Sequence, residues 1–281
     1  MKVALAQLNF HVGNFEANSS KIIECINRAK NQNADVVVFP ELAVCAYPPL
    51  DFLEFEDFIK RCHTAIDEIA TVCTGITAIV GCPSRNPVLE GKNLYNSAFV
   101  LADGSVKQVV NKTLLPTYDV FDEYRYFEPN RNFNCIEVAG EKVALTICED
   151  LWNGEDDPLY IHSPMKELQK EKPVLIINIA ASPFDYKHAE QRKAILKRNV
   201  LQYGVPLVYV NHVGAQTEII FDGGSVVWNA DGGLAHECNY FEEDFVVIDT
   251  VDLNKKTISE KPVTHDKTEW IYEALIMGIK E

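Results

Sequence analysis

The sequence predicts an α/β fold in which two mixed β-sheets are stacked face to face and helices cover their outer faces. Short apolar runs of strand length alternate along the chain with longer stretches of helical periodicity. The Asp103-Gly104 turn between two apolar runs predicts an antiparallel hairpin, so the sheet is expected to be mixed. The order strand, helix, strand then recurs in the second half, without a residue-level repeat. Sheets with one apolar face each are expected to pack against each other in layers.

The first half of the chain is expected to form one sheet with two covering helices. Residues 55–73 have the clearest helical pattern, because their apolar side chains recur at three- and four-residue steps. Apolar runs of strand length lie on both sides of this helix. The expected strands are residues 2–8, 36–39, 77–81, 94–101 and 106–110, and the expected helices are residues 15–30 and 55–73.

The second half is expected to repeat this arrangement and to end in a helix. The expected elements are strands at residues 133–138, 142–147, 174–179 and 207–211, a helix at residues 186–203, and a third hairpin at residues 219–228. Residues 264–281 have the pattern of an amphipathic helix, which either docks on a neighbour or packs on its own domain. We expect one domain over residues 1–263, with residues 264–281 as a linker helix.

Composition and charge limit the classes of function. The 281 residues include 47% apolar and 24% charged residues, enough for one large core. The net charge of −15 argues against nucleic-acid or anionic-membrane binding, and a small polar substrate fits better. No apolar stretch has the length of a membrane span, and the run at residues 3–8 is too short for a signal-peptide core. A soluble, cytoplasmic protein is expected.

The eight cysteines do not form a metal-binding or disulfide pattern. They are widely spaced, without a C-x-x-C pair and without a histidine at ligand spacing. Most lie in apolar stretches, where a thiol usually packs as a small core side chain. No metal site is expected, and a Cys–His hydrolase is disfavoured because no histidine lies in a comparable strand-end motif.

Three reactive side chains directly follow apolar strands. Glu41 comes after four apolar residues and a proline, Lys112 follows residues 106–110, and Cys148 follows residues 142–147. In layered α/β folds the carboxyl ends of strands are where sites assemble. A carboxylate, an ammonium and a thiol at one edge supply a general base, an oxyanion stabiliser and a nucleophile, which is the equipment for acyl transfer.

Each of these side chains also has an ordinary structural explanation. A lone glutamate after a strand is most often a solvated loop acid, a lone lysine can extend its ammonium to solvent, and most cysteines after apolar strands are inert. Cys148 is expected at an elbow-like turn, exposed at the sheet edge, because acidic and turn-forming residues follow it. The three occurring together favour catalysis. The segment at residues 118–127 is rich in aromatic and charged residues, and by itself it is typical of a surface loop. Close after Lys112, it can instead form the wall of a pocket for a small polar molecule.

The Glu41, Lys112 and Cys148 segments, in this order and spacing, resemble the nitrilase superfamily of carbon–nitrogen hydrolases. More narrowly, residues 148–152, 118–127 and 181–184 resemble the amidohydrolase (glutaminase) domain of glutamine-dependent NAD⁺ synthetases. Other amidases of the superfamily usually carry tyrosine after the nucleophile, whereas this chain has Glu149. The resemblance implies a four-layer α-β-β-α sandwich.

The resemblance also implies a mechanism. Cys148 would attack the side-chain amide of L-glutamine, Glu41 would take the thiol proton and later pass a proton to the departing ammonia, and Lys112 and the backbone after Cys148 would hold the oxyanion. Water would then hydrolyse the thioester. Glu123 would be a supporting second acid, and the implied substrate-binding residues are Tyr47, Tyr118, Phe121, Glu149, Trp152, Ser182 and His188.

Two of these positions carry specific expectations. Glu149 is the candidate partner of the substrate α-ammonium. His188 stands where the family usually has lysine or arginine for the α-carboxylate, six residues after Ser182, and its charge depends on its pKa. The neighbouring Lys187 is the alternative contact.

The implied partner is an ATP-dependent synthetase domain. Family members continue into a domain with a Ser-Gly-Gly-x-Asp-Ser phosphate loop, and the sequence contains no such motif. The chain is therefore expected to release ammonia for the amidation of nicotinic acid adenine dinucleotide by that domain, which would use ATP and Mg²⁺. No cofactor is expected here, and the resemblance implies a homo-oligomer.

Two other functions fit the residues. One is a free-standing amidase that acts on another small amide. The other is a catalytically silent domain that binds a partner through its terminal helix and acidic surface.

Overall fold

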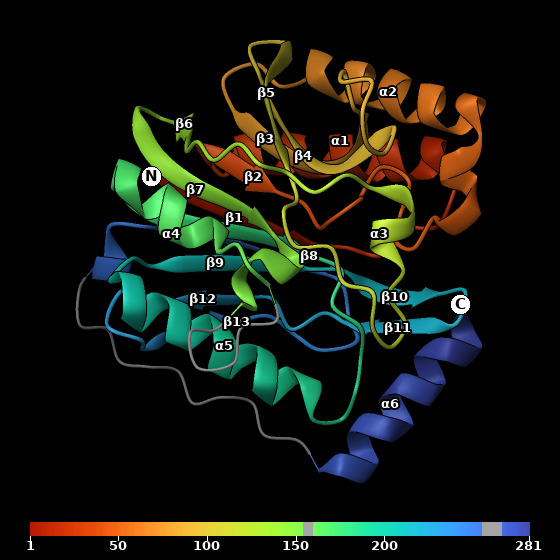
Figure 1. Cartoon of the computed structure of the whole chain (residues 1–281). Coiled ribbons are helices and arrows are strands. Elements are labelled where there is room, and N and C mark those ends of the chain that lie inside the picture. The colour runs from red at the N-terminus through yellow and green to blue at the C-terminus, as the bar shows by residue number, and fades with distance from the viewer. Residues whose placement is uncertain (154–159, 255–265) are drawn as a thin grey trace.

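The computed structural model describes residues 1–153, 160–254 and 266–281. Two six-stranded sheets are stacked on each other, and helices cover both outer faces (Figure 1). The core between the sheets is built from inward-facing side chains of both, such as Val3 and Leu5 from one and Ile177 and Val208 from the other. The predicted α/β sandwich of two mixed sheets is confirmed.

The first sheet has the strand order β14-β1-β2-β3-β4-β5. Three neighbouring strands, β1, β2 and β3, run parallel, and antiparallel strands flank them on both sides. The predicted hairpin at the Asp103-Gly104 turn joins β4 to β5. The strands are β1 (Lys2–Gln7), β2 (Val36–Val38), β3 (Thr77–Arg85), β4 (Leu94–Ala102), β5 (Ser105–Asn111) and β14 (Asp244–Asp249).

The second sheet has the order β13-β12-β9-β8-β7-β6 and the same plan. The parallel strands β7, β8 and β9 lie at its centre, between antiparallel neighbours. The central strands are almost wholly buried, which explains their continuous apolar sequences. The strands are β6 (Ile136–Val138), β7 (Glu141–Ile147), β8 (Leu175–Ala180), β9 (Leu207–Asn211), β12 (Val226–Trp228) and β13 (Leu234–Glu237).

The prediction of one hairpin over residues 219–228 is wrong. β11 (Ile219–Asp222) pairs with the preceding strand β10 (Val213–Gln216), and the two form a separate antiparallel ribbon. β12 instead pairs with β9 and β13. Gly223 and Gly224 separate β11 from β12, and both have positive φ angles of 70° and 59°. Two successive left-handed residues redirect the chain from the ribbon into the sheet.

The helices lie where the apolar periodicity placed them. α1 (Phe15–Asn31) and α2 (Glu56–Thr71) cover the first sheet, and α5 (His188–Tyr203) covers the second with the short α4 (Pro164–Leu168), as Figure 1 shows. Apolar side chains of α1 and α2, such as Ile22 and Ile66, form the outer core of the first sheet. The short elements are α3 (Glu123–Tyr126) and the 3₁₀ turns η1 (Leu50–Glu54), η2 (Cys148–Leu151), η3 (Gln169–Glu171) and η4 (Asp252–Asn254).

The terminal helix α6 (Lys267–Lys280) packs on its own domain. Trp270 is buried with Ala189 and Tyr240 and lies against Phe184, and α6 contacts both β10 and β11. The helix is confirmed, and its packing matches one of the two expected alternatives. The predicted boundary between residues 263 and 264 lies outside the described residues.

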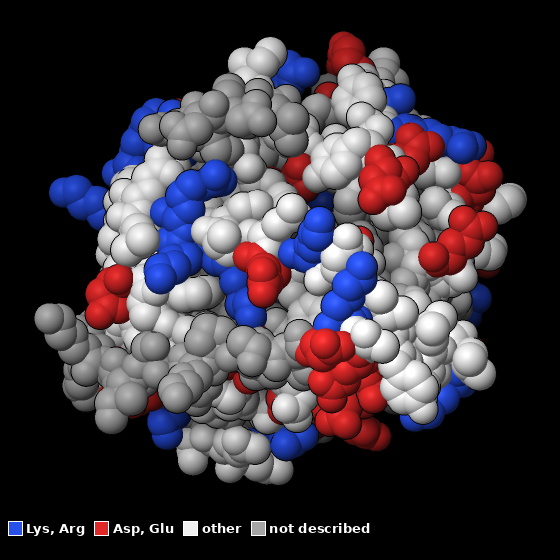
Figure 2. All heavy atoms as spheres, turned by 90° about the horizontal axis from the view of Figure 1, so that it is seen from below, with Lys and Arg blue, Asp and Glu red and all other residues white. Residues whose placement is uncertain are grey.

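Among the described residues, basic and acidic side chains are intermixed on the face below α5 and α6, and they form no single large basic patch there (Figure 2). All eight cysteines are free thiols, and all except the half-buried Cys135 are buried. Within residues 1–153, 160–254 and 266–281, no helix is long and apolar enough to cross a membrane.

Candidate active site

The structure brings together Glu41, Lys112 and Cys148, which come from three strand ends. Glu41 follows β2, Lys112 follows β5, and Cys148 follows β7. The Nζ atom of Lys112 lies 2.7 Å from Oε1 of Glu41. The charges of Glu41 and Lys112 both act on the thiol of Cys148. The two sheets therefore meet at the place where the sequence predicted a site.

Lys112 lies between two carboxylates. Its ammonium donates to Glu41 and also to Oε1 of Glu123, at 2.7 Å in both cases. Burial alone would lower the pKa of Lys112, but the charges of Glu123 and Glu41 outweigh this effect and raise it. Burial and the charge of Glu41 raise the pKa of Glu123 to about 7, against the opposing effect of Lys112. Lys112 therefore stays positively charged at neutral pH, and Glu123 changes its protonation state near pH 7.

Cys148 occupies a strained turn. Its φ angle is +43°, in the left-handed region that residues other than glycine rarely adopt, and it begins the 3₁₀ turn η2. The elbow-like turn agrees with the sequence, but the prediction of a thiol exposed at the sheet edge is wrong, because only 5% of Cys148 is accessible. The two stacked sheets and the loops around this edge enclose it. Burial, followed by the charge of Glu41, raises the pKa of the thiol, so attack requires a base.

Two polar residues that the sequence analysis did not assign hold Glu41 and Lys112 in place. The side chain of Asn96 on β4 donates to Glu41 at 2.7 Å and to Glu123 at 3.4 Å. Asp150, two residues after Cys148, accepts hydrogen bonds from the backbone N–H groups of Thr113 and Leu114, at 2.9 Å each. Asp150 therefore fixes the lysine segment against the nucleophile turn. Its place in the motif was a usable signal, whereas Asn96 lies inside a strand and had none.

Glu149 is buried beside the nucleophile and is held by two tyrosines. The Tyr118 hydroxyl lies 3.0 Å from each carboxylate oxygen, and the Tyr160 hydroxyl donates to Oε1 at 3.0 Å. Burial raises the pKa of Glu149 above its usual value, and the opposing effects of Lys112 and both hydroxyls are smaller. Tyr118 and Glu149 were assigned to substrate recognition from the sequence, and Tyr160 was not.

Aromatic side chains lie between the two acids of the site. The Tyr47 hydroxyl donates to Glu123 at 3.0 Å, and the ring of Tyr47 packs edge-on against Phe121, which in turn contacts Tyr118. The centroids of the Tyr47 and Phe121 rings are 6.5 Å apart. Tyr47, Phe121 and Tyr118 therefore form a continuous chain of contacts from Glu123, beside Lys112, to Glu149, which follows Cys148.

Ser182 belongs to a buried polar network at the end of β8. Its backbone N–H donates to Oδ1 of Asn211 at 2.8 Å, and its hydroxyl accepts from Arg192 at 3.4 Å. Arg192 itself makes a bidentate ion pair with Asp222, with both contacts at 3.0 Å. Arg192 and Asp222 are 30 residues apart in the chain, and sequence reasoning did not find them.

His188 and Lys187 lie at the start of α5 in different environments. The ring of His188 lies 5.0 Å from that of Trp152, and burial together with the charge of Arg192 lowers its pKa to about 4. His188 is therefore uncharged at neutral pH. Lys187 is exposed, with its ammonium 5.3 Å from the ring of Tyr186.

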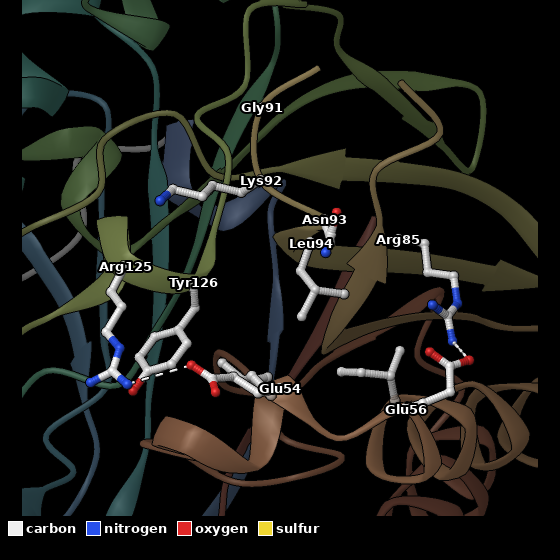
Figure 3. A pocket seen from close by; sticks show the side chains of 11 residues that line it. Glu54, Glu56, Arg85, Gly91, Lys92, Asn93, Leu94, Arg125 and Tyr126 are labelled. Atoms are coloured by element: carbon white, nitrogen blue, oxygen red, sulfur yellow. Dashed lines mark hydrogen bonds and ion pairs between the residues drawn. The ribbon is translucent and has the colours of Figure 1, made fainter. Parts of the chain in front are cut away.

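A separate hollow of about 430 Å³ lies beside η1, α2 and α3 (Figure 3). Its rim carries Arg85, which pairs with Glu56, and Arg125, which pairs with Glu54 at 3.4 Å. These pairs are exposed to solvent. Arg125 and Tyr126, from the segment at residues 118–127, line this hollow, whereas none of the predicted catalytic or individually named substrate-binding side chains does. We therefore do not assign the chemistry to it.

The donor set at the site suits proton and acyl transfer. In the parts of the chain that the structure describes, no group of three or more His, Cys, Asp or Glu side chains is placed to hold a metal ion. A buried thiol beside a carboxylate and a permanent ammonium can attack a carbonyl carbon and stabilise the resulting oxyanion.

Comparison with known proteins agrees with this geometry. Residues 2–257 match the model of the carbon-nitrogen hydrolase family. The chain is 34% identical over 99% of its length to a glutamine-dependent NAD(+) synthetase of Synechocystis sp., and 36% identical over its whole length to that of Acinetobacter baylyi. These alignments cover 51% and 50% of the relatives, so the chain spans about half the length of the curated relatives that it matches.

Solved structures show the same fold. A glutamine-dependent NAD⁺ synthetase from Acinetobacter baumannii matches with a TM-score of 0.87 and 35% identity, covering 99% of this chain and 51% of that one. An amidase from Nesterenkonia sp. AN1 matches with a TM-score of 0.75 and 21% identity, covering 89% of this chain and 92% of the amidase. The second match supports the fold alone.

Proposed function

The chain belongs to the carbon–nitrogen hydrolase family, and on that premise we propose that it is a glutaminase domain, which releases ammonia from L-glutamine for a synthetase partner. The observation that carries the proposal is Lys112 buried between Glu41 and Glu123, with their charges acting on Cys148. The chain is similar to about half the length of each of these glutamine-dependent NAD⁺ synthetases, and this similarity supports the choice of substrate and partner.

The geometry supports the following first half-reaction. Glu41 takes the proton of the Cys148 thiol as sulfur attacks the amide carbon of glutamine. Lys112 and the backbone N–H after Cys148 stabilise the oxyanion of the tetrahedral intermediate. When the intermediate collapses, the carbon–nitrogen bond breaks, Glu41 returns its proton to the leaving nitrogen, and ammonia departs from a glutamyl thioester.

The second half-reaction restores the enzyme. Glu41 takes a proton from a water molecule, which attacks the thioester carbon. The carbon–sulfur bond then breaks to release glutamate, and Glu41 returns the proton to the sulfur of Cys148. Asn96 and Glu123 keep Glu41 and Lys112 aligned through both steps, because Asn96 donates a hydrogen bond to Glu41 and Glu123 accepts one from Lys112. This reaction uses no cofactor of its own.

The remaining proposals concern the context of the reaction. We assign ATP, Mg²⁺ and the amidation of nicotinic acid adenine dinucleotide to the synthetase half of the relatives, since this sequence lacks a Ser-Gly-Gly-x-Asp-Ser loop. α6 is proposed as the helix that leads toward that half. Cytoplasmic location and homo-oligomeric assembly complete the proposal, and cell fractionation and light scattering test them.

Ammonia release from L-glutamine tests the proposed function directly. Wild-type protein should release ammonia and glutamate in equal amounts, and Cys148→Ala should reduce the rate at least about 10³-fold, because the nucleophile is lost. Cys135→Ala is the matched control, since Cys135 is the half-buried cysteine outside the site, and it should retain the wild-type rate.

The alternatives give different results in the same experiment. Equal turnover of glutaramate, which is glutamine without its α-amino group, would favour an amidase of broader specificity. No thioester from any amide, even with the synthetase half added, would favour a silent partner-binding domain.

A further inference from the structure

The site contains more negative than positive charge. The charges that act on the thiol of Cys148 are those of Glu41, Glu149 and Glu123, opposed by Lys112. Lys112 makes its ion pairs with Glu41 and Glu123, at 2.7 Å each. Glu149 makes its short contacts with hydroxyl groups instead. A ligand with a cationic group would therefore balance the charge best beside Glu149.

The two tyrosines leave room for such a group. An ionised carboxylate accepts about four hydrogen bonds. The hydroxyls of Tyr118 and Tyr160 donate one hydrogen each, so about half of the acceptor capacity of Glu149 remains. A hydroxyl group is neutral and stabilises the carboxylate without cancelling its charge. The two hydroxyls thus hold the Glu149 carboxyl group in one orientation.

Tyr160 reaches Glu149 from a segment that Asn153 ties to the nucleophile turn. The side chain of Asn153 donates to the carbonyl oxygens of Tyr160 and His162, at 2.8 Å each, and accepts from the N–H of Tyr160 at 3.2 Å. Asn153 itself follows Trp152 directly after η2. The position of Tyr160 is therefore coupled to the turn that carries Cys148 and Glu149.

We propose that Tyr160 is a positioning residue for substrate specificity, which holds Glu149 ready to bind the ammonium group of an α-amino acid amide. This inference rests on the proposed glutaminase function and deepens it. Substrates that carry a primary ammonium benefit from Tyr160, whereas simple amides of the same length do not. Tyr160 acts through Glu149 and makes no bond to the reacting carbonyl.

Tyr160→Phe tests this role, because it removes the hydroxyl and keeps the ring. KM for L-glutamine should rise about tenfold, which corresponds to the loss of one hydrogen bond to a charged group. kcat for L-glutamine and both constants for glutaramate should stay within about twofold, since the reacting groups are untouched. Tyr272→Phe, on the exposed face of α6, is the matched control and should leave KM and kcat for both substrates unchanged.

A double variant separates positioning from a purely structural effect. In a Glu149→Gln background the acceptor of the ammonium is already lost, so adding Tyr160→Phe should not raise KM for glutamine further. Independent, additive losses in the double variant would contradict the inference.

The inference and the proposed function fail in different ways. Turnover of glutamine by wild type, with the same preference over glutaramate in Tyr160→Phe, would overturn the role of Tyr160 and leave the glutaminase proposal standing. Calorimetry of L-glutamine binding to Cys148→Ala protein, with and without Tyr160→Phe, provides a readout without turnover. No binding and no hydrolysis of glutamine would reject the proposed function, and this inference with it.

Discussion

Lys112 and Arg85 are both basic side chains paired with glutamate, yet the two pairs differ in nearly every physical respect. Lys112 and Glu41 are each 1% exposed, whereas Arg85 is 46% and Glu56 78% exposed. Water screens the pair at the rim of the hollow in Figure 3, so its partners gain little from each other. The buried pair has no water to replace a lost partner. The comparison shows that burial, more than residue type, makes a charged pair capable of chemistry.

Removing the buried ammonium should produce the largest effect. Lys112→Met leaves Glu41 and Glu123 without their cation, and we expect the free energy of unfolding to fall by about 3–5 kcal/mol. Glutamine turnover should also be abolished, because the oxyanion loses its stabiliser. Urea unfolding measures the first effect. Lys107→Met, which breaks the exposed pair with Asp103, is the matched control, and equal losses in both variants would contradict the comparison.

Neutralising the second acid should have a smaller effect. Glu123→Gln preserves the shape and the contacts to Lys112 in part, and we expect kcat to fall about 10- to 100-fold. Because burial raises the pKa of Glu123 to about 7, kcat of the wild type should decrease as the pH falls through about 7 and Glu123 becomes protonated. The Gln variant should lack this step. A pH–rate profile checks both statements, with Glu56→Gln as the exposed control, and an unchanged step in Glu123→Gln would reject this role.

Placing a permanent cation at the start of α5 should have a moderate effect on binding. His188, whose pKa burial and Arg192 lower to about 4, gives no charge to a substrate carboxylate at neutral pH. His188→Lys should lower KM for glutamine about fivefold, because a charge-assisted hydrogen bond replaces a neutral one. Steady-state kinetics at pH 7 tests this.

Lys187→Ala separates the two candidate contacts. If the carboxylate lies at position 188, this change leaves KM for glutamine within about twofold. A large increase in KM in Lys187→Ala, with no gain in His188→Lys, would instead assign the carboxylate to Lys187.

Breaking the exposed pair should have the smallest effect. Arg85→Ala removes the partner of Glu56 at the hollow, and the free energy of unfolding should change by about 0.5 kcal/mol or less. Glutamine turnover should be unchanged. Urea unfolding beside Lys112→Met shows whether burial sets the difference, and a loss as large as that of Lys112→Met would mean that it does not.

The sequence predicted the parts of the site that follow apolar strands. Glu41, Lys112 and Cys148 were found because buried strands of a layered fold end at a common edge. Asn96 was not found, since a polar residue inside β4 has no pattern of its own. Tyr160 was missed because it lies outside any helix or strand, and periodicity does not encode its contact with Glu149.

In the fold, too, local patterns were predicted from the sequence and long-range contacts were not. Helices α1, α2 and α5 follow from apolar periodicity, which is a local property. The pairing of β1 with β14 joins the two ends of the domain, and no local pattern specifies such a partner. Residues 219–228 were predicted as one hairpin, although Gly223 and Gly224 within them separate a ribbon from a sheet. Burial of Cys148 likewise results from long-range packing.

Covalent labelling with a diazoketone analogue of glutamine, followed by intact-protein mass spectrometry, tests the central claim most directly. The account predicts one adduct on the wild-type protein and on Cys135→Ala, no adduct on Cys148→Ala, and slower labelling of Glu41→Gln because the base is lost. No adduct on the wild type, even with the synthetase half supplied, or an adduct that persists without Cys148, would contradict it.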